Sequence, residues 1–326
     1  MKYIVALAFF IMTTVAQASN IVLVVPGIAG GGPDISGRLV ARHIGKHLPG
    51  NPTVTVSNMQ GAGGLVMTNW LYNVADQENT IALLNANNDV ILNGLLGNEN
   101  SKYDLKKFNW LFSAEDGENN VFVLWANRKR GLINVDLMLT SNDFVVGNQG
   151  SNNILTYFLT DVVRSKSRII HGYKDVRQAL IVNEIDARFG TLSSVKANFP
   201  SWLKEGNEIH PILQVGSKRR HPELPQVPNV REFTTDPSHL AVLDFYERQV
   251  RLARLIFAGP NMSKERAQQF ISAGVALEKD IDYLTEAKKL EMEGDFMQHK
   301  ETMQIMSEIM NTSTEVLKIF KQTSGR

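Results

Sequence analysis

Short, continuous apolar runs alternate along the chain with longer segments in which apolar residues recur every three or four positions. The run IVLVV at 21–25 has no polar interruption, which is typical of a strand buried on both faces. A glycine-rich loop follows, and apolar residues at helical spacing then predict a helix from residue 33 or 34 to about 48. The succession repeats with a strand at 53–56, a second glycine loop and a helix whose apolar face includes Val66.

The same pattern continues through the rest of the chain. Further strands are predicted from 80, within 119–126, at 144–146, from 168, at 187–189 and at 254–257. A helix is predicted at 154–164, an irregular Pro-rich surface segment at 219–233, and helices after residue 257. Strand, loop and helix alternating at this spacing predict parallel sheets with helices on both faces.

This pattern predicts two α/β domains. Residues 19–122 together with 253–326 form domain 1, and residues 123–252 form domain 2. In this division the C-terminal strand and helices return to complete the first domain.

The first residues have the features of a secretory signal peptide, predicted at 1–18. Lys2 supplies a single positive charge, and the apolar stretch at 4–15 is too short to cross a bilayer. Ala16 and Ala18 fit the small-residue cleavage pattern, so we expect cleavage near Ala18 and export to the periplasm. An uncleaved N-terminal membrane anchor is the alternative.

Composition narrows the classes of function. The chain of 326 residues has no cysteine, which rules out disulfides, thiolate chemistry and a lipid-modified cysteine. Its 34 basic and 33 acidic side chains become 33 and 33 once Lys2 is removed with the signal peptide. Such a balance provides no field that attracts nucleic acid or a membrane surface. We therefore expect no nucleic-acid partner.

The glycine loops are the strongest candidates for a binding site. Ligands of parallel α/β sheets lie at the carboxyl ends of strands, beside helix N-termini whose first N–H groups have no partner within the helix. Polar, glycine-rich segments stand at such ends at 30–34, 61–64, 85–88, 147–153 and 190–193. Together they suit a small anion, most simply a carboxylate. Tight turn geometry is the alternative for any one loop.

The candidate ligand-binding residues lie on or beside these segments and near His171. His171 lies close to Tyr173 and could line a cleft, although an ordinary loop histidine is the favoured interpretation. The candidates are Ala29, Gly30, Gly31, Gly32, Asp34, Gly61, Ala62, Gly63, Gly64, Asn85, Asn87, Gln149, Gly150, Ser151, Asn152, Tyr173, Thr191 and Ser193. Asp34 is also expected to cap the first helix, with a local ion pair to Arg38 four residues later.

Other kinds of binding or catalytic site have less support in the sequence. Residues 32–39 resemble a phosphate loop, but Arg38 replaces the lysine and Leu39 replaces the magnesium-binding hydroxyl. His43 and His47 have metal-chelating spacing, but Ile44 stands where a zinc-protease pattern needs glutamate, and a polar helix surface is the favoured interpretation. The methionines Met297, Met303, Met306 and Met310 could bind Cu(I) or fill a core. No catalytic set is recognisable, so the chain is expected to be a binding protein without cofactor or metal, not an enzyme.

Several motifs resemble those of one known family, the substrate-binding proteins of tripartite tricarboxylate transporters, also called Bug proteins. The family's N-x-x-G-A-G-G loop stands intact at 58–64, and its L-P-x-V-P segment stands at 224–228. Its first loop, P-x-G-G-x-x-D-x-x-x-R, is similar to residues 31–38 with an offset of one residue. Further similarity is found at 171–175, 183–186 and 254–270, whereas 76–80, 85–88 and Gly172 depart from the family pattern.

The resemblance implies a type II periplasmic binding protein, with two doubly wound α/β domains, two crossing strands and a ligand cleft between the domains. It implies that backbone N–H groups, hydroxyls and bridging water hold a small carboxylate, without a guanidinium clamp. The implied protein is a periplasmic monomer that delivers its ligand to membrane permease subunits. Two other functions stay open at this point: a ligand-sensing partner of a membrane sensor kinase, and an exported enzyme.

Overall fold

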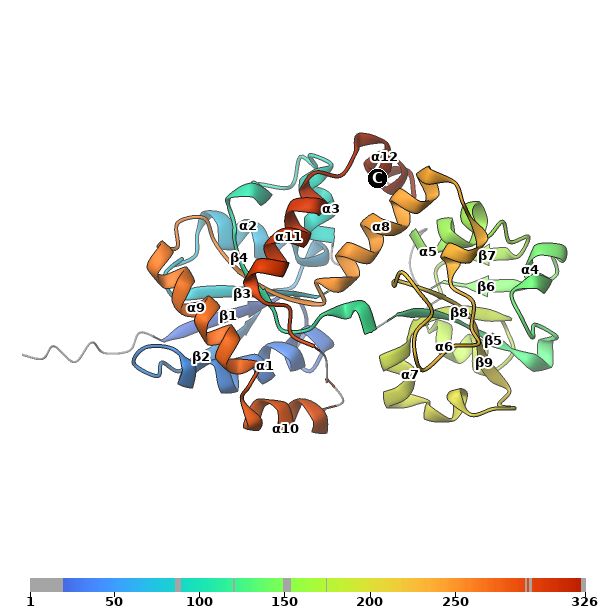
Figure 1. The fold of residues 1–326 in the computed structure, drawn as a ribbon, viewed down its shortest axis with the longest axis horizontal. Helices are drawn as coiled ribbons and strands as arrows, with labels where there is room; N and C mark the ends of the chain where they lie inside the picture. Colours follow the sequence, from blue (N-terminus) through green and yellow to red (C-terminus); the bar gives the residue numbers. More distant parts are fainter. Residues whose placement is uncertain are drawn as a thin grey trace, which may run out of the picture.

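The computed structural model describes residues 20–85, 89–119, 121–148, 154–173, 175–290, 292 and 295–323. The segment interpreted as a signal peptide lies outside these residues, and so do five of the candidate site residues: Asn87, Gln149, Gly150, Ser151 and Asn152. Figure 1 shows the fold as two α/β lobes side by side. Within the described ranges, every helix is too short or too polar to span a bilayer.

The first lobe contains a five-stranded sheet in the order β2-β1-β3-β10-β4. Its strands are β1 (Ile21–Val25), β2 (Val54–Asn58), β3 (Thr80–Asn85), β4 (Asn109–Ser113) and β10 (Arg254–Ala258). The first three strands are mutually parallel, whereas β10 runs antiparallel to both β3 and β4. The sheet is therefore mixed, whereas the sequence predicted a purely parallel one. The difference arises because β10 begins at the edge of the sheet where the other strands end.

The second lobe contains another five-stranded mixed sheet, in the order β7-β6-β8-β5-β9. Its strands are β5 (Phe122–Asn127), β6 (Val145–Gly147), β7 (Arg168–Ile170), β8 (Ala187–Thr191) and β9 (Ile209–Val215). Here β5 is the antiparallel strand and pairs with β8 and β9, while β6 is parallel to β7 and β8. The domain limits expected from the sequence remain a prediction. Sheet membership changes between β4 and β5 and again before β10.

Helices pack against both sheets. Those of the first lobe are α1 (Gly32–Ile44), α2 (Leu65–Asn73), α3 (Asp89–Leu95), α9 (Lys264–Leu277), α10 (Ile281–Lys289) and α11 (His299–Met310). Those of the second lobe are α4 (Asp136–Thr140), α5 (Ile154–Tyr157), α6 (Val176–Ile181) and α7 (Leu192–Asn198). The helix predicted at 154–164 is regular only over α5 and continues as a wider turn, Phe158–Val162.

Two further helices connect the lobes, α8 (Pro237–Arg251) and α12 (Thr314–Thr323). Figure 1 shows α8 crossing the gap between the lobes, and α12 packs on both α8 and α5. The rings of Phe245 and Phe320 meet edge to face, with their centroids 4.7 Å apart. One apolar cluster consequently continues from the first lobe into the second.

One sequence expectation about burial is wrong. Val66 is 47% exposed, because α2 buries its neighbours Leu65 and Met67 instead. The Pro-rich segment at 219–233 runs largely along the surface, as expected, and a few buried residues anchor it in the second lobe. Its Leu224 and Val227 are buried, and the amide of Gln214 donates hydrogen bonds to both of their carbonyls.

Candidate ligand-binding site

The carboxyl ends of the parallel strands in the first lobe lie at the boundary with the second. Arg254, the first residue of β10, pairs with Asn85, the last residue of β3. Because β10 begins where the chain returns from the second lobe, β3 ends at that boundary. β1 and β2 run parallel to β3, so the glycine loops that follow them lie at the same edge.

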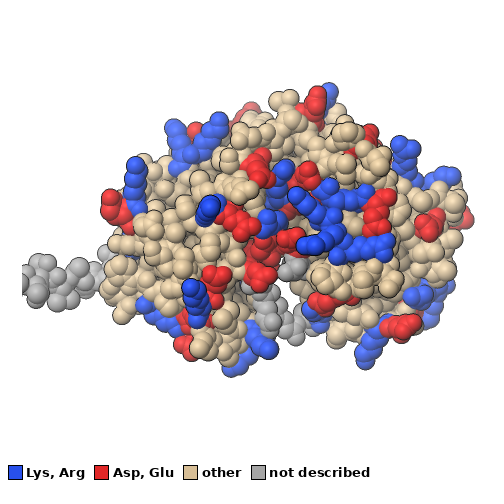
Figure 2. Space-filling view, viewed as in Figure 1, with Lys and Arg blue, Asp and Glu red and all other residues tan. Residues whose placement is uncertain are grey.

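The second sheet has the equivalent arrangement. Phe122, at which β5 enters this lobe, pairs with Thr191 at the end of β8. β6 is parallel to β8, and its last residue, Gly147, pairs with Arg188. The strand ends of both sheets therefore face the boundary between the lobes, where Figure 2 shows an indentation at the lower edge of the molecule.

Asp34 shapes the first glycine loop. It is the third residue of α1 and only 2% exposed. Its carboxylate accepts hydrogen bonds from Gly30 N at 2.8 Å, from Arg38 Nε at 2.9 Å and from Asn58 Nδ2 at 3.0 Å. The guanidinium of Arg38, followed by the Gly30 amide, lowers the pKa of Asp34 to about 2 against the effect of burial, so this side chain is ionised at neutral pH.

The expected cap by Asp34 is wrong, whereas its ion pair with Arg38 is confirmed. Gly31 is the N-cap of α1, and no side chain caps it. Asp34 lies too far into the first turn to cap, and it folds back onto Gly30 instead. With its oxygens engaged, the carboxylate holds the loop in position and leaves the first-turn amides of α1 without a side-chain partner.

The second glycine loop has an unusual backbone. All four residues at 61–64 have positive φ, including Ala62 at 46°. Gly64 precedes α2 with φ of 95°, and a Cβ at this position would lie 3.2 Å from Val90 and 3.3 Å from Pro26. Both conformation and space therefore require glycine there. No side chain caps α2 either, but the amides of Gly64 and Leu65 donate to the carbonyls of Gly61 and Ala62 within the loop. Amide donors for an anion at this loop therefore come from the residues before Gly64.

The structure brings the described candidates together at two facing edges. Seven of those on the first lobe are exposed or half-buried at the strand ends: Ala29, Gly30, Gly31, Gly32, Gly61, Ala62 and Gly63. Asp34 and Gly64 are buried beneath them. The backbone of Asn85 ends β3 at the same edge, but its side chain is outside what the structure describes. Contact of any of these residues with a ligand remains a prediction.

On the second lobe, Tyr173, Thr191 and Ser193 lie at the matching edge. The amide of Tyr173 donates to Asn148 O just beyond β6. Thr191 caps α7 by accepting from Ser194 N at 3.2 Å, and Ser193 Oγ donates to Thr191 Oγ1 at 3.3 Å. The hydroxyl of Thr191 thus has a structural task besides any contact with a ligand.

Sequence reasoning missed one residue at this edge. Arg188 lies in β8, is 7% exposed, and extends along the strand to cover Gly190. The signal was present as a single charged residue within the apolar strand ARFG. Only the register of β8 between β6 and β5 reveals that this strand ends at the interlobe boundary.

The two histidines with chelating spacing bind separate carboxylates of the first lobe. His43 Nε2 lies 2.7 Å from Glu286 Oε2, and His47 Nε2 lies 2.8 Å from Asp280 Oδ2. In the part of the chain that the structure describes, no cluster of three or more His, Asp or Glu side chains could hold a metal ion. Of the methionines weighed for copper, Met297 and Met306 are fully buried in the core.

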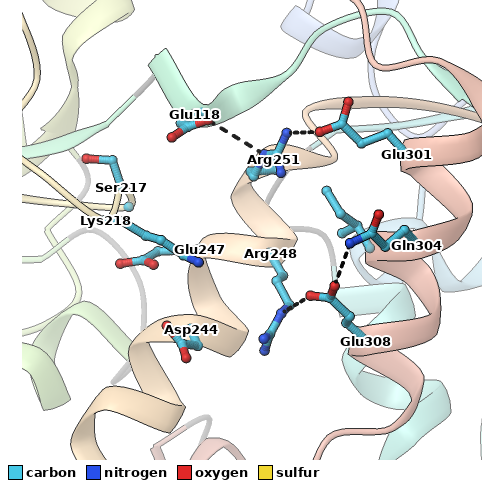
Figure 3. A pocket seen from close by; sticks show the side chains of 12 residues that line it. Glu118, Ser217, Lys218, Asp244, Glu247, Arg248, Arg251, Glu301, Gln304 and Glu308 are labelled. Carbon is cyan, nitrogen blue, oxygen red and sulfur yellow. Dashed lines mark hydrogen bonds and ion pairs between the residues drawn. The ribbon is translucent and has the colours of Figure 1, made fainter.

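A cavity lies between α8 and α11 (Figure 3). Its volume is about 250 Å³, and five carboxylates and three cationic side chains line it. Arg251 bridges Asp116 and Glu301, while Arg248 pairs with Glu308 at 2.7 Å. The excess of acidic groups disfavours a carboxylate ligand in this cavity.

No protein-family model matches the chain, and comparison with curated proteins finds no match. Solved structures do match it over nearly their whole length. A TctC solute-binding protein from Polaromonas, without ligand, has a TM-score of 0.67 at 18% identity, covering 94% of this chain and 98% of that chain. An adipate-bound Rhodopseudomonas palustris protein has a TM-score of 0.62 at 15% identity, covering 94% and 97%.

MatC from Rhodopseudomonas palustris, with bound malate, has a TM-score of 0.60 at 15% identity, covering 91% of this chain and 98% of that chain. TctC and Bug proteins are thus among the structural neighbours of this chain. Identities this low establish the fold alone. The two-domain α/β fold of periplasmic solute-binding proteins, predicted from the sequence, is confirmed.

Proposed function

We propose that this chain is an extracytoplasmic solute-binding protein of the tripartite tricarboxylate transporter type, which captures a small carboxylate between its lobes. The observation that carries the proposal is the convergence of strand ends from both sheets on the interlobe boundary. Two glycine loops and the uncapped N-terminus of α1 contribute amide donors at the first of these edges. Such donors suit an anion, and malate and adipate occupy two of the structural neighbours.

In this proposal the lobes close on the ligand because the closed form offers donors from both edges at once. The closed surface is then recognised by membrane permease subunits in the periplasm, and the binding protein acts as a monomer without enzymatic activity or cofactor. A sensor-kinase partner would use the same closed surface. Permease genes beside the coding gene favour transport, whereas a histidine kinase gene in that place favours sensing.

The binding proposal is tested by thermal shift of the purified mature chain with a panel of mono-, di- and tricarboxylates. A carboxylate that binds the folded form raises the melting temperature progressively with its concentration. At a ligand concentration of a hundred times Kd, the free energy of unfolding increases by about 2.7 kcal/mol. Sugars and cations are the controls. A shift with one of these controls and none with any carboxylate would contradict the proposal.

A further inference from the structure

Arg188 is a buried cation of the second lobe, 7% exposed. Its Nε donates to the carbonyl of Phe189 at 2.9 Å. Among the residues that the structure describes, no carboxylate forms an ion pair with its guanidinium. Burying a charge is costly unless it is paired, so the position of this side chain calls for an explanation.

Arg254 provides the comparison within the same molecule. It is 6% exposed, close to the 7% of Arg188, but it pairs with Glu115 at 2.8 Å and donates to the carbonyl of Met292 at 3.0 Å. The chain therefore compensates its other equally buried arginine among the described residues with a carboxylate of its own. Arg188 has no such compensation among these residues.

The charged groups near Arg188 do not fill this role. Asp175 attracts it through space, but its carboxylate is engaged at the start of α6, where it accepts from the amides of Arg177 and Gln178. Arg177 repels it. Burial, followed by this repulsion, lowers the pKa of Arg188 to about 10, so the guanidinium is still protonated at neutral pH.

Gly190 holds the space that the guanidinium occupies. A Cβ at Gly190 would lie 2.0 Å from Nη2 and 3.0 Å from Cζ of Arg188. The guanidinium therefore points along β8 toward its carboxyl end, at the interlobe boundary. The carbonyl of Gly190 accepts from Trp125 Nε1 at 3.2 Å, and Trp125 is fully buried, which fixes this end of the strand.

We propose that Arg188 binds a carboxylate of the ligand from the second lobe, opposite the glycine loops of the first lobe. The inference rests on the proposed function and deepens it. The Nη groups can donate two parallel hydrogen bonds to one carboxylate, an arrangement that neutral amides do not reproduce. A ligand with two carboxylates then places one on each edge, so Arg188 selects dicarboxylates over monocarboxylates of equal length.

The experiment measures dissociation constants of wild type and R188M by calorimetry, with malate, succinate and adipate and with butyrate and hexanoate as monocarboxylate probes. We expect R188M to weaken dicarboxylate binding by at least about tenfold and to remove the preference over monocarboxylates. R177M is the matched control. It removes an exposed arginine of the same neighbourhood and should change affinity by less than about threefold.

A second variant, G190A, tests the same role of Arg188 if R188M folds poorly. In G190A the new methyl group displaces the guanidinium while the charge is retained, so dicarboxylate affinity should fall in the wild-type background but not in R188M. Unchanged dicarboxylate affinity in both R188M and G190A would overturn the role of Arg188 alone. Absence of carboxylate binding by wild type would overturn the proposed function itself. Binding of sodium sulfate with the same affinity as a dicarboxylate would overturn the assignment to carboxylates.

Discussion

The side-chain amide of Asn58 donates to Oδ1 of Asp34 at 3.0 Å and so joins the ends of β1 and β2. Asn58 is the last residue of β2, and it also donates to the carbonyl of Gly27 at 3.2 Å. Through these bonds one buried carboxylate links the first glycine loop to the strand end that leads into the second. Links that hold a site in position before binding lower the entropic cost of binding.

The first prediction concerns acid stability. The pKa of Asp34 falls from 3.8 to about 2 on folding, so its stabilising effect is complete above pH 3.8 and is lost as the pH falls toward 2. The D34N variant should be less stable than wild type in urea unfolding at neutral pH, and the difference should shrink as the pH approaches 2. A difference that is constant with pH would contradict a role for the ionised carboxylate.

The second prediction tests the amide donors with a variant that should block ligand binding without destabilising the fold. Gly32 begins α1 with ordinary backbone angles, and nothing lies within 4 Å of a Cβ placed there. G32L should therefore keep the wild-type melting temperature within about 2 °C and lower carboxylate affinity at least about tenfold, because its side chain covers the amides of the loop. Gly63 is a poorer test, because its φ of 61° would itself strain a bulky residue.

G97A serves as the control for G32L. Gly97 also has open space around it, but it lies in a turn after α3, away from the glycine loops. Its φ of 62° makes a small loss of stability expected, with carboxylate affinity unchanged. Undiminished binding by G32L would argue against amide donors at this loop.

The third prediction concerns the charged cavity between the lobes. Arg251 bridges Asp116 on the crossover and Glu301 on α11, and the side chain of Asp116 is only 13% exposed. R251M leaves that carboxylate without its cation, so we expect a loss of about 1–3 kcal/mol in urea unfolding. R248M removes one pair with the more exposed Glu308 and should cost less than about 1 kcal/mol. Equal losses would contradict the bridging role.

The fourth prediction tests α12 as a connection between the lobes. Phe320 is 4% exposed and packs edge to face on Phe245 of α8. F320A should destabilise the protein by about 3 kcal/mol through lost contacts and a cavity. K318A, which changes an exposed residue of the same helix, should have an effect below about 0.5 kcal/mol. Thermal unfolding followed by circular dichroism measures both, and similar melting temperatures for the two variants would refute this packing.

Local pattern predicted most of the elements. β1 begins and ends as expected, because an uninterrupted apolar run between a polar residue and a proline has few alternatives. The strands β4 and β9 were missed, and the parallel direction was wrong for β5 and β10. Strand direction depends on where a segment enters the sheet, and this is a property of the path of the whole chain.

By itself, the sequence determined the two-lobed α/β class and the glycine loops after β1 and β2, and it predicted a carboxylate ligand. Glycine spacing and apolar periodicity are local properties that act within a few residues. Tertiary structure alone decided that Asp34 links the first glycine loop to the end of β2 and does not cap its helix. It alone also buried Arg188 beside Gly190, because the pairing and burial of a charge depend on residues brought together from distant parts of the chain.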